Sequence, residues 1–383
     1  MNVTTDFSFA QNSMLLYSEF SLASVNFVYL FEAMRIFRRS LHVRRHGFKR
    51  YPGTASAICK QIVQNCWNGT FFQTSTGHFN QFWTRDFGWC TQSLLALGYT
   101  KEVTATLDYA LARFIKHDAI TTTITPGGKP FDFPTFGIDS LAFLYNSLAL
   151  VKNKELTEKY RPFLQQQLHA VSPLLEPTGL VKKNIHVSSM KDHAIRQSSC
   201  YDTCMLGLLS RAAKKLALEN PLKQFDYPQL LLDNYWTGNA FCDDLSDKNI
   251  ISGDATILPL WTGMIRSPKI ARAALTGARL ADLTSPFPLK YTAHIPNSPE
   301  VLASLFVPGY EHDTIWAHLG MMYLHVAKKY DRTAFRSARA AYARTIEQHG
   351  TFLEVYNPDG TLFSKPTYIA DEGMLWASIF ATL

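Results

Sequence analysis

The feature that most constrains the fold of this chain is a helical repeat of apolar residues along nearly its whole length. Apolar side chains recur at spacings of three and four residues, which is the pattern of an amphipathic α-helix. Only short segments, at 121–125 and 352–356, have the composition of β-strands. The windows predicted to be helical are 14–37, 55–67, 87–97, 104–115, 139–151, 156–171, 201–218, 228–235, 268–283, 314–328, 333–349 and 371–382.

The connections between these windows alternate between short and long, which favours antiparallel helical hairpins packed side by side. About six such hairpins closed in a ring would form an all-α (α/α)6 toroid with its long loops on one face. The scarcity of strands argues against Rossmann and β-sandwich folds. No linker rich in Pro, Gly or Ser and no break in composition divides the chain, so we expect one domain over residues 1–383.

The net charge is +7, and much of the positive excess comes from residues 35–50. A nucleic-acid site would need an accompanying motif, yet the sequence has no zinc-finger, RNA-recognition or glycine-rich phosphate pattern. Runs of like charge are usually solvated, so we interpret this run as a helix end and a loop, and we expect no nucleic-acid partner. Attraction to an anionic surface is the alternative that the run leaves open.

The N-terminal residues 1–50 are both apolar and basic, and we expect them to form a helical segment of the single domain. Within 14–37, Glu19, Glu32 and Arg35 leave uncharged runs shorter than the ~20 residues that a membrane span needs. No basic stretch precedes this window and no small-residue cleavage site follows it, which argues against a signal peptide. We therefore predict a first buried helix and no transmembrane segment.

The cysteines lie in mostly apolar helical windows and form no Cys-x-x-Cys pair. This distribution favours reduced core thiols over a disulfide framework or a zinc site, and it predicts a cytoplasmic protein. The six residues are Cys59, Cys66, Cys90, Cys200, Cys204 and Cys242.

The most unusual polar cluster is Trp83-Thr84-Arg85-Asp86, directly before a predicted helix. An indole that can stack on a sugar ring, a guanidinium and a carboxylate are the groups that a sugar-binding subsite needs. Asp86 has an alternative function as an acid at the helix N-terminus, where Asp is favoured. That alternative leaves Trp83 and Arg85 unexplained.

This segment resembles the WTRD segment of the glucoamylases and related six-hairpin glycosidases, including processing α-glucosidases and amylo-α-1,6-glucosidases. In those families the Arg and Asp bind the non-reducing sugar. Residues 130–140 are similar to a segment of the same families that ends in an Asp-Ser helix start, so the resemblance implies sugar binding by Asp139. Capping of that helix is the alternative function of Asp139.

Near the C-terminus, the segment 353–360 and the following Leu375-Trp376 resemble the Glu-x-Tyr segment and late helix of these families. In those families the Glu activates water. Glu354 also lies in an otherwise apolar stretch, where an isolated carboxylate is costly to bury unless it has partners or chemistry. We therefore predict Glu354 as the catalytic base, with a structural salt bridge as the alternative.

The catalytic acid is expected in residues 189–196. The glucoamylases use a Glu in a Trp-Glu-Glu segment, which this sequence lacks there, and the segment is more similar to six-hairpin families with an Asp acid. The resemblance implies Asp192 as the acid, with Arg196 and Tyr201 in contact with substrate. An ion pair between Asp192 and Arg196 is the alternative, and it would lower the pKa of Asp192, against the need of an acid.

A further loop, 309–316, carries three titratable residues before a predicted helix, which is more than capping requires. We expect Glu311, His312 and Trp316 to contact substrate. Glu311 is also the main rival of Asp192 as the catalytic acid.

The related families invert the anomeric configuration, so the resemblance implies an inverting hydrolase that releases a sugar from the non-reducing end of an α-glucoside. Its carbohydrate substrate is the one partner we expect, and no metal or organic cofactor is needed. Alternatives are a sugar-binding toroid without catalysis, an inverting phosphorylase, and a sugar epimerase that uses histidines such as His193 and His312. The sequence contains no indication of the oligomeric state.

Overall fold

The computed structural model describes residues 27–183, 185–187, 190–191, 196–292 and 307–383. Within them, thirteen α-helices account for most of the regular structure, which confirms the prediction of an all-α fold. The helices are α2 Phe27–His46, α3 Ala55–Cys66, α4 Thr84–Ala96, α5 Thr100–His117, α6 Ile138–Val151, α7 Lys154–His169, α8 Cys200–Lys215, α9 Tyr227–Tyr235, α10 Gly253–Trp261, α11 Pro268–Leu280, α12 Ala317–Tyr330, α13 Arg332–His349 and α14 Ala377–Ala381.

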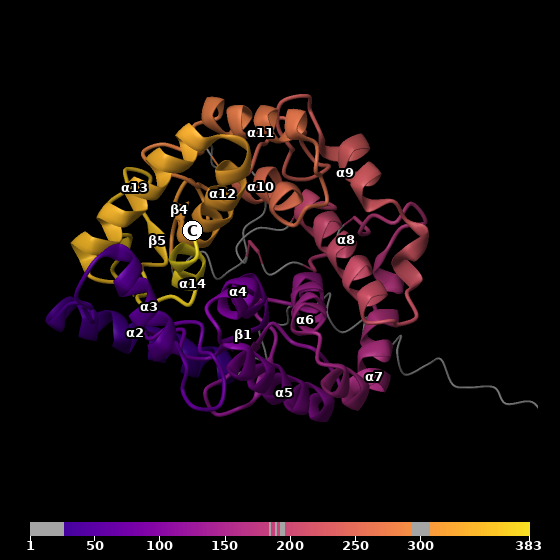
Figure 1. Ribbon diagram of the computed structural model, residues 1–383, viewed down its shortest axis with the longest axis horizontal. Coiled ribbons are helices and arrows are strands. Elements are labelled where there is room, and N and C mark those ends of the chain that lie inside the picture. The colour runs from indigo at the N-terminus through magenta and orange to yellow at the C-terminus, as the bar shows by residue number, and fades with distance from the viewer. Residues whose placement is uncertain (1–26, 184, 188–189, 192–195, 293–306) are drawn as a thin grey trace, which may run out of the picture.

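The helices form a ring with an inner and an outer layer (Figure 1). Helices α4, α6, α8, α10 and α12 pack against one another in that order, and α14 packs against α4. The outer helices α5, α7, α9, α11 and α13 each pack against the inner helix that precedes them in the chain, and α3 contacts both α13 and α14. The two ends of the helical region therefore meet and close the ring.

Three helices differ from the sequence prediction, of which α14 covers only Ala377–Ala381 of the predicted window 371–382. The first described helix is α2, which runs through the basic stretch that we expected to end a helix and begin a loop. Residues 14–26 of the predicted first helix lie outside the described residues, and α2 is not buried, since it exposes several large apolar side chains. Helix α10 has no amphipathic period, because Gly253 to Leu260 are all buried and no polar face marks one. Its start is defined by Ser252, whose hydroxyl accepts a hydrogen bond from the amide of Ala255.

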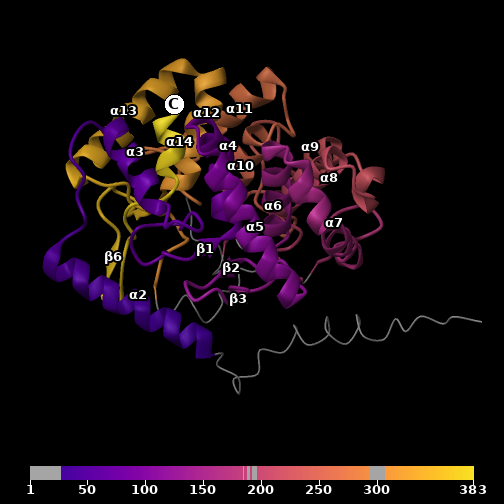
Figure 2. The ribbon, with the colours of Figure 1, turned by 60° about the horizontal axis from the view of Figure 1, so that its bottom comes forward.

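Short strands lie at one end of the helices (Figure 2). The strand pairs are antiparallel, with Trp83 opposite Thr123 and Trp316 opposite Val355. β1 leads directly into α4 and β4 leads directly into α12, so these pairs set where two inner helices begin. The strands are β1 Phe82–Trp83, β2 Thr123–Ile124, β3 Pro130–Phe131, β4 Ile315–Trp316, β5 Val355–Tyr356, β6 Ser364–Lys365 and β7 Tyr368–Ile369.

No helix in the described ranges is both long enough and apolar enough to cross a membrane.

The inner helices approach closely where one of them carries glycine. A Cβ atom on Gly88 of α4 would lie 2.2 Å from the Cβ of Phe143 on α6. Such a contact cannot be accommodated without moving one helix, because protein interiors are close-packed. Gly88 therefore sets the spacing between α4 and α6.

We expect Gly88→Ala to lower the free energy of unfolding by about 1–3 kcal/mol, the usual cost of overpacking a core. The midpoint of urea denaturation measures this loss. Gly127→Ala is the matched control, because the nearest atom to its new Cβ would be 3.8 Å away. Equal midpoints for the two variants would show that the close approach of α4 and α6 does not limit packing.

Candidate active site

The carboxylate of Glu354 is enclosed at the strand-bearing end of the helices. It lies between α13 and β5, and the residue is only 1% exposed. Tyr310 donates a hydrogen bond to Oε1, and Tyr368 donates one to Oε2 at 2.6 Å. The amide of Asp371 also donates to Oε2, at 2.9 Å. All three partners are donors, which is the environment of an ionised carboxylate.

Burial nevertheless dominates the protonation of Glu354 and raises its pKa to about 8. The hydrogen bond from the Asp371 amide opposes this rise, as do the two tyrosine hydroxyls, whereas the charge of Asp371 adds to it. Carboxyl groups with strongly raised pKa values are concentrated at functional sites. Glu354 is therefore a stronger base than an ordinary carboxylate.

Asp371 organises the loop that precedes β1. Its carboxylate accepts hydrogen bonds from the amides of His78 and Phe79, both at 2.8 Å, and from the hydroxyl of Ser75. The ring Nε2 of His78 lies 3.1 Å from the hydroxyl of Tyr368. Burial lowers the pKa of His78 to about 4, so its ring is neutral at pH 7. Tyr368, one of the two tyrosines that donate to Glu354, is thus oriented by the neutral imidazole of His78.

Sequence reasoning missed most of this network. Tyr310 lies within the 309–316 loop that the sequence singled out, but its hydroxyl was not predicted to contact Glu354. His78, Tyr368 and Asp371 were not predicted at all. The one available signal was Asp371 beside Glu372, two acids at the start of a window rich in buried residues.

Glu372 does not belong to this network. Its carboxylate pairs with Arg39 of α2 and accepts a hydrogen bond from the amide of Lys49 at 3.1 Å. It therefore helps to hold the N-terminal helix to the ring.

The WTRD residues lie at the start of α4, beside the N-terminal end of α14. Asp86 accepts a hydrogen bond from the indole of Trp376 at 2.9 Å, and Arg85 lies 3.3 Å from its other oxygen. Burial raises the pKa of Asp86, against the lowering effect of Arg85. The guanidinium of Arg85 also sits 4.8 Å from the ring centre of Trp89. Asp86 does not cap its helix, because the N-cap residue is Trp83.

A stack of aromatic rings continues this cluster into the centre of the ring of helices. His318 of α12 lies parallel to Trp89 with ring centres 4.4 Å apart, and it contacts Trp376 at 4.8 Å. Both nitrogens of His318 and the indole nitrogens of Trp83 and Trp89 are buried, and they have no hydrogen-bond partner among the described residues. Buried polar atoms are normally paired, so these nitrogens indicate where a polar ligand would bind.

Asp139 and Tyr201 lie together on neighbouring inner helices. The hydroxyl of Tyr201 on α8 donates to Oδ2 of Asp139 on α6 at 2.9 Å, and the amide of Ser140 donates to Oδ1. Asp139 is fully buried and does not cap its helix, since Gly137 is the N-cap residue. The two predicted residues are therefore partners of each other.

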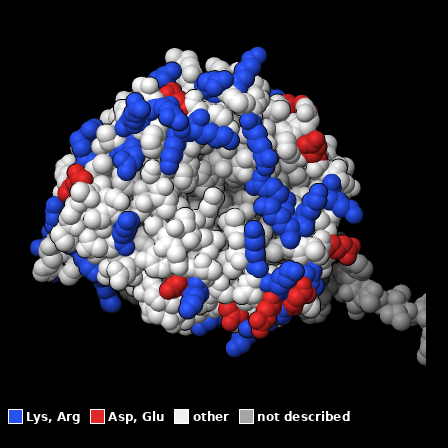
Figure 3. Space-filling view, in the orientation of Figure 1, with Lys and Arg blue, Asp and Glu red and all other residues white. Residues whose placement is uncertain are grey.

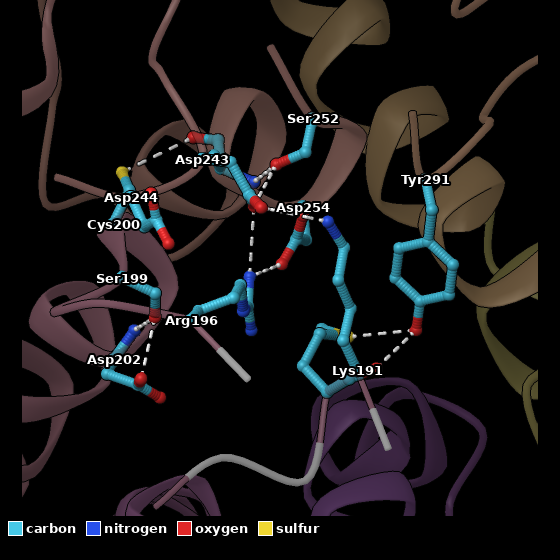
Figure 4. A network of polar contacts seen from close by, with 12 residues as sticks. Lys191, Arg196, Ser199, Cys200, Asp202, Asp243, Asp244, Ser252, Asp254 and Tyr291 are labelled. Atoms are coloured by element: carbon cyan, nitrogen blue, oxygen red, sulfur yellow. Dashed lines mark hydrogen bonds and ion pairs between the residues drawn. The ribbon is translucent and has the colours of Figure 1, made fainter. Parts of the chain in front are cut away.

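Arg196 is held in a buried ionic network with Lys191 and two aspartates (Figure 4). Its Nη1 lies 3.1 Å from Asp243 and 2.7 Å from Asp254, and Lys191 lies 3.1 Å from Asp243. We expected Arg196 to face substrate, but its Nη1 atom pairs with both Asp243 and Asp254. Burial by itself would raise the pKa of Asp243, but Lys191 and Arg196 outweigh it and hold the pKa at about 2.

The predicted acid Asp192 lies outside the described residues, as does His193. The segment that carries them, 192–195, is flanked on both sides by members of the ionic network, Lys191 and Arg196.

The 309–316 loop places its residues beside Glu354. The indole of Trp316 donates to the carbonyl of Tyr310 at 3.1 Å, and the two rings lie 4.7 Å apart. Trp316 also contacts His318 at 5.2 Å, so it joins the Glu354 network to the aromatic stack. Glu311 is buried, and the carbonyl of His312 accepts hydrogen bonds from Thr292. The structure thus gathers the predicted residues of this loop at the same end of the ring.

No group of three or more His, Cys, Asp or Glu side chains in the described part of the chain could hold a metal ion. All six cysteines are buried and free.

No protein-family profile matches this chain, and no curated protein matches it in sequence. Its fold does match solved structures. A rhamnosidase from Klebsiella oxytoca with rhamnose bound superposes with a TM-score of 0.59 at 12% identity. The match covers 87% of this chain but only 65% of the rhamnosidase.

Other matches cover nearly the whole of both chains. A glycosidase in complex with glucose has a TM-score of 0.57 at 11% identity, over 92% of this chain and 96% of its own. A GH63 mannosylglycerate hydrolase from Thermus thermophilus, also in complex with glucose, has a TM-score of 0.56 at 14% identity, over 86% and 100%. The chain therefore has the all-α fold of these glycosidases.

The ionic network predicts how one substitution affects stability. Asp243→Asn would remove the carboxylate that pairs with Lys191 and one of the two that pair with Arg196, and we expect a loss of about 3–5 kcal/mol. Because the folded pKa of Asp243 is about 2, below its ordinary 3.8, its stabilisation is present above pH 4 and fades as the pH falls to 2. Urea midpoints at pH 7 and pH 3 measure both effects.

Asp247→Asn is the matched control, because Asp247 lies in the same loop and is exposed. Equal stability of the two variants at pH 7 would contradict the role of Asp243 in the network.

Proposed function

We propose that this chain is an inverting glycoside hydrolase, folded as a single (α/α)6 toroid over residues 1–383, that removes a sugar from the non-reducing end of an α-glucoside. The proposal rests above all on Glu354, a buried carboxylate surrounded by three hydrogen-bond donors beside a row of aromatic rings. The fold shared with glycosidases supports it.

In this mechanism Glu354 is the general base. Its carboxylate would take a proton from a water molecule as that water attacks the anomeric carbon. A raised pKa increases the strength of the base, and the donors Tyr310 and Tyr368 keep its oxygens in a defined orientation. To complete the cycle, Glu354 gives this proton to solvent water and the general acid takes one from solvent.

Asp192 is the proposed general acid, which gives its proton to the leaving glycosidic oxygen. The support is the resemblance of residues 189–196 to families with an Asp acid, together with the anchored positions of Lys191 and Arg196 on either side.

The sugar would bind over Trp83, Arg85 and Asp86, with Trp89 and His318 below it. The carboxylate of Asp86 and the guanidinium of Arg85 suit vicinal hydroxyls, and the free nitrogens of Trp83 and His318 can bond further hydroxyls. This reaction needs no metal or organic cofactor. The free cysteines support a cytoplasmic location.

A sugar-binding protein without catalysis is the second candidate. The observation in its favour is the pKa of Glu354, since a carboxyl with a pKa of about 8 is mostly protonated at pH 7. A protonated Glu354 could bind a sugar hydroxyl but could not activate water.

The first experiment compares wild type with Glu354→Gln and Asp192→Asn on a panel of α-glucosides and sucrose. We expect either substitution to lower kcat by about 10²–10⁴-fold, because each removes one half of the acid–base pair. Proton NMR of the first-formed anomer reports inversion. Glu155→Gln, an exposed acid of α7, is the matched control.

Activity retained in Asp192→Asn but lost in Glu311→Gln would assign the acid to Glu311. No turnover by wild type on any glycoside, with glucose binding intact, would favour the binding-protein candidate.

The pH dependence tests the base directly. Glu354 must be ionised to act, so over the range in which the acid stays protonated kcat/KM of wild type should rise about tenfold per pH unit up to the pKa of about 8. The same pKa lies above the unfolded value of 4.5, so ionisation of Glu354 reduces stability as the pH rises from 4.5 through 8. Glu354→Gln should therefore melt at a higher temperature than wild type at pH 9. Glu354→Gln that melts at the same temperature as wild type at pH 9 would contradict the raised pKa of Glu354.

The sugar subsite is tested by substitutions that preserve shape. Arg85→Lys should raise KM by about tenfold or more, since an ammonium cannot replace the planar guanidinium beside Asp86. Trp83→Phe keeps an aromatic ring but removes the free indole nitrogen, and it should also weaken glucose binding measured by calorimetry. Trp236→Phe, outside this cluster, is the control. Unchanged glucose affinity in both site variants would place the subsite elsewhere.

A further inference from the structure

The large apolar side chains that remain exposed are concentrated on one helix. The described residues contain seven such side chains, and five of them belong to α2. Among these, Phe31 is 63% exposed and Leu30 is 48% exposed. Contiguous exposed apolar surface of this kind usually marks an interaction site. The five residues, which we call the α2 stripe, are Leu30, Phe31, Met34, Phe37 and Leu41.

The spacing of the stripe places it along one side of the helix. At 100° per residue, Leu30, Met34, Phe37 and Leu41 fall within an arc of about 60°. The side that packs on the ring carries other residues, including the buried Ser40 and Val43. Helix α2 therefore docks on the ring by one side and exposes its apolar stripe on another.

Polar contacts prevent α2 from turning its stripe inward. Arg35 donates to Asn80 at 3.0 Å, and Arg39 pairs with Glu372. The hydroxyl of Ser40 accepts from the amide of Ile369 at 3.2 Å. At the C-terminal end of the helix, Arg44 donates to backbone carbonyls of the β6–β7 hairpin. These contacts span three turns, so the outward side of α2 is fixed.

Two arginines lie within the arc of the stripe. By the same helical geometry, Arg45 and Arg38 fall at about 60° and 80° from Leu30, between Met34 at about 40° and Phe31 at about 100°. Both arginines are exposed, and they make no hydrogen bond or ion pair with the rest of the described chain. The single acid of the helix, Glu32, is bound to Arg35. Exposed apolar side chains with arginines among them suit a lipid–water interface, because an arginine can extend its guanidinium to the headgroups while its apolar neighbours enter the acyl region.

We propose that α2 binds the surface of an anionic lipid bilayer, with the α2 stripe among the upper acyl chains and Arg38 and Arg45 against the headgroups. The positive charges of Arg38 and Arg45 favour lipid over a second copy of this chain as the partner, because pairing two α2 helices would bring their arginines together. Helix α2 lies at the strand-bearing end of the molecule (Figure 2), so bound α2 would bring the loops around Glu354 near the bilayer.

Positive charge is not confined to α2, because lysine and arginine side chains are spread over the face of the ring shown in Figure 3. Among the described residues outside α2, only Ile115 and Leu280 are large, apolar and exposed, and they lie on different helices. Charge without apolar surface gives weaker and less localised binding to lipid.

The test is flotation of the full chain with vesicles of phosphatidylcholine alone or with phosphatidylserine. We expect wild type to float with the anionic vesicles and to be released by high salt, which screens the arginines. Arg38→Gln with Arg45→Gln should weaken binding by about 25-fold, at about 1 kcal/mol for each cation. Phe31→Ser with Phe37→Ser should abolish flotation.

Matched controls carry the same changes elsewhere. Ile115→Ser with Leu280→Ser removes the exposed apolar residues outside α2, and Arg332→Gln with Arg336→Gln removes two exposed cations of α13. Both control variants should float like wild type. Melting temperatures of all variants establish that they are folded, as expected for exposed positions.

Three results would overturn the proposal. Wild type that does not float with anionic vesicles would exclude lipid as the partner. Flotation that survives both α2 variants would locate lipid binding outside the stripe. A wild-type dimer that dissociates on Phe31→Ser with Phe37→Ser, without any vesicle binding, would identify a second copy of the chain as the partner. None of these results depends on the glycosidase proposal.

Discussion

Glu354 and Asp371 exchange hydrogen bonds that hold together the loops at the strand-bearing end of the ring. The amide of Glu354 donates to the carbonyl of Asp371 at 3.0 Å, and the amide of Asp371 donates back to the Glu354 carboxylate at 2.9 Å. The carbonyl of Glu354 also accepts from the amide of Ala317, which begins α12. Asp371 in turn holds the loop before β1 through His78 and Phe79. The starts of α4, α12 and α14 are thus positioned by one pair of residues.

This arrangement has an energetic cost that its donors only partly offset. A carboxylate as buried as Glu354 loses its hydration, and the hydrogen bonds from Tyr310, Tyr368 and the Asp371 amide do not restore the ordinary pKa. Proteins tolerate such groups where chemistry requires them, and the rest of the fold supplies the stability. Asp243, in the buried ionic network, is different, because Lys191 and Arg196 hold its pKa at about 2. The surroundings of Glu354 thus disfavour its ionised form, whereas those of Asp243 favour it.

Helix α2 is attached to the same loops. Ser40 binds Ile369, next to the Tyr368 that contacts Glu354, and Arg35 binds Asn80, close to His78. The outward side of α2 is therefore separated from the proposed catalytic base by only a few hydrogen-bonded residues. This proximity links the surface proposal to the site without requiring any conformational change.

The sequence by itself determined the helical class and most helix positions, and it singled out Trp83, Arg85, Asp86 and Glu354 as candidates, because periodicity and short motifs are local properties. It could not give the extent of α10, whose buried surface has no period, or the outward side of α2, because exposure depends on what packs opposite. The partners Tyr310, Tyr368, His78 and Asp371 also came only from tertiary structure, since they are brought together from segments up to 293 residues apart. The same holds for Arg196, whose carboxylate partners lie 47 and 58 residues further along the chain. Local patterns report what a segment prefers, whereas the protonation of an acid and the direction of a side chain depend on neighbours that the chain order does not reveal.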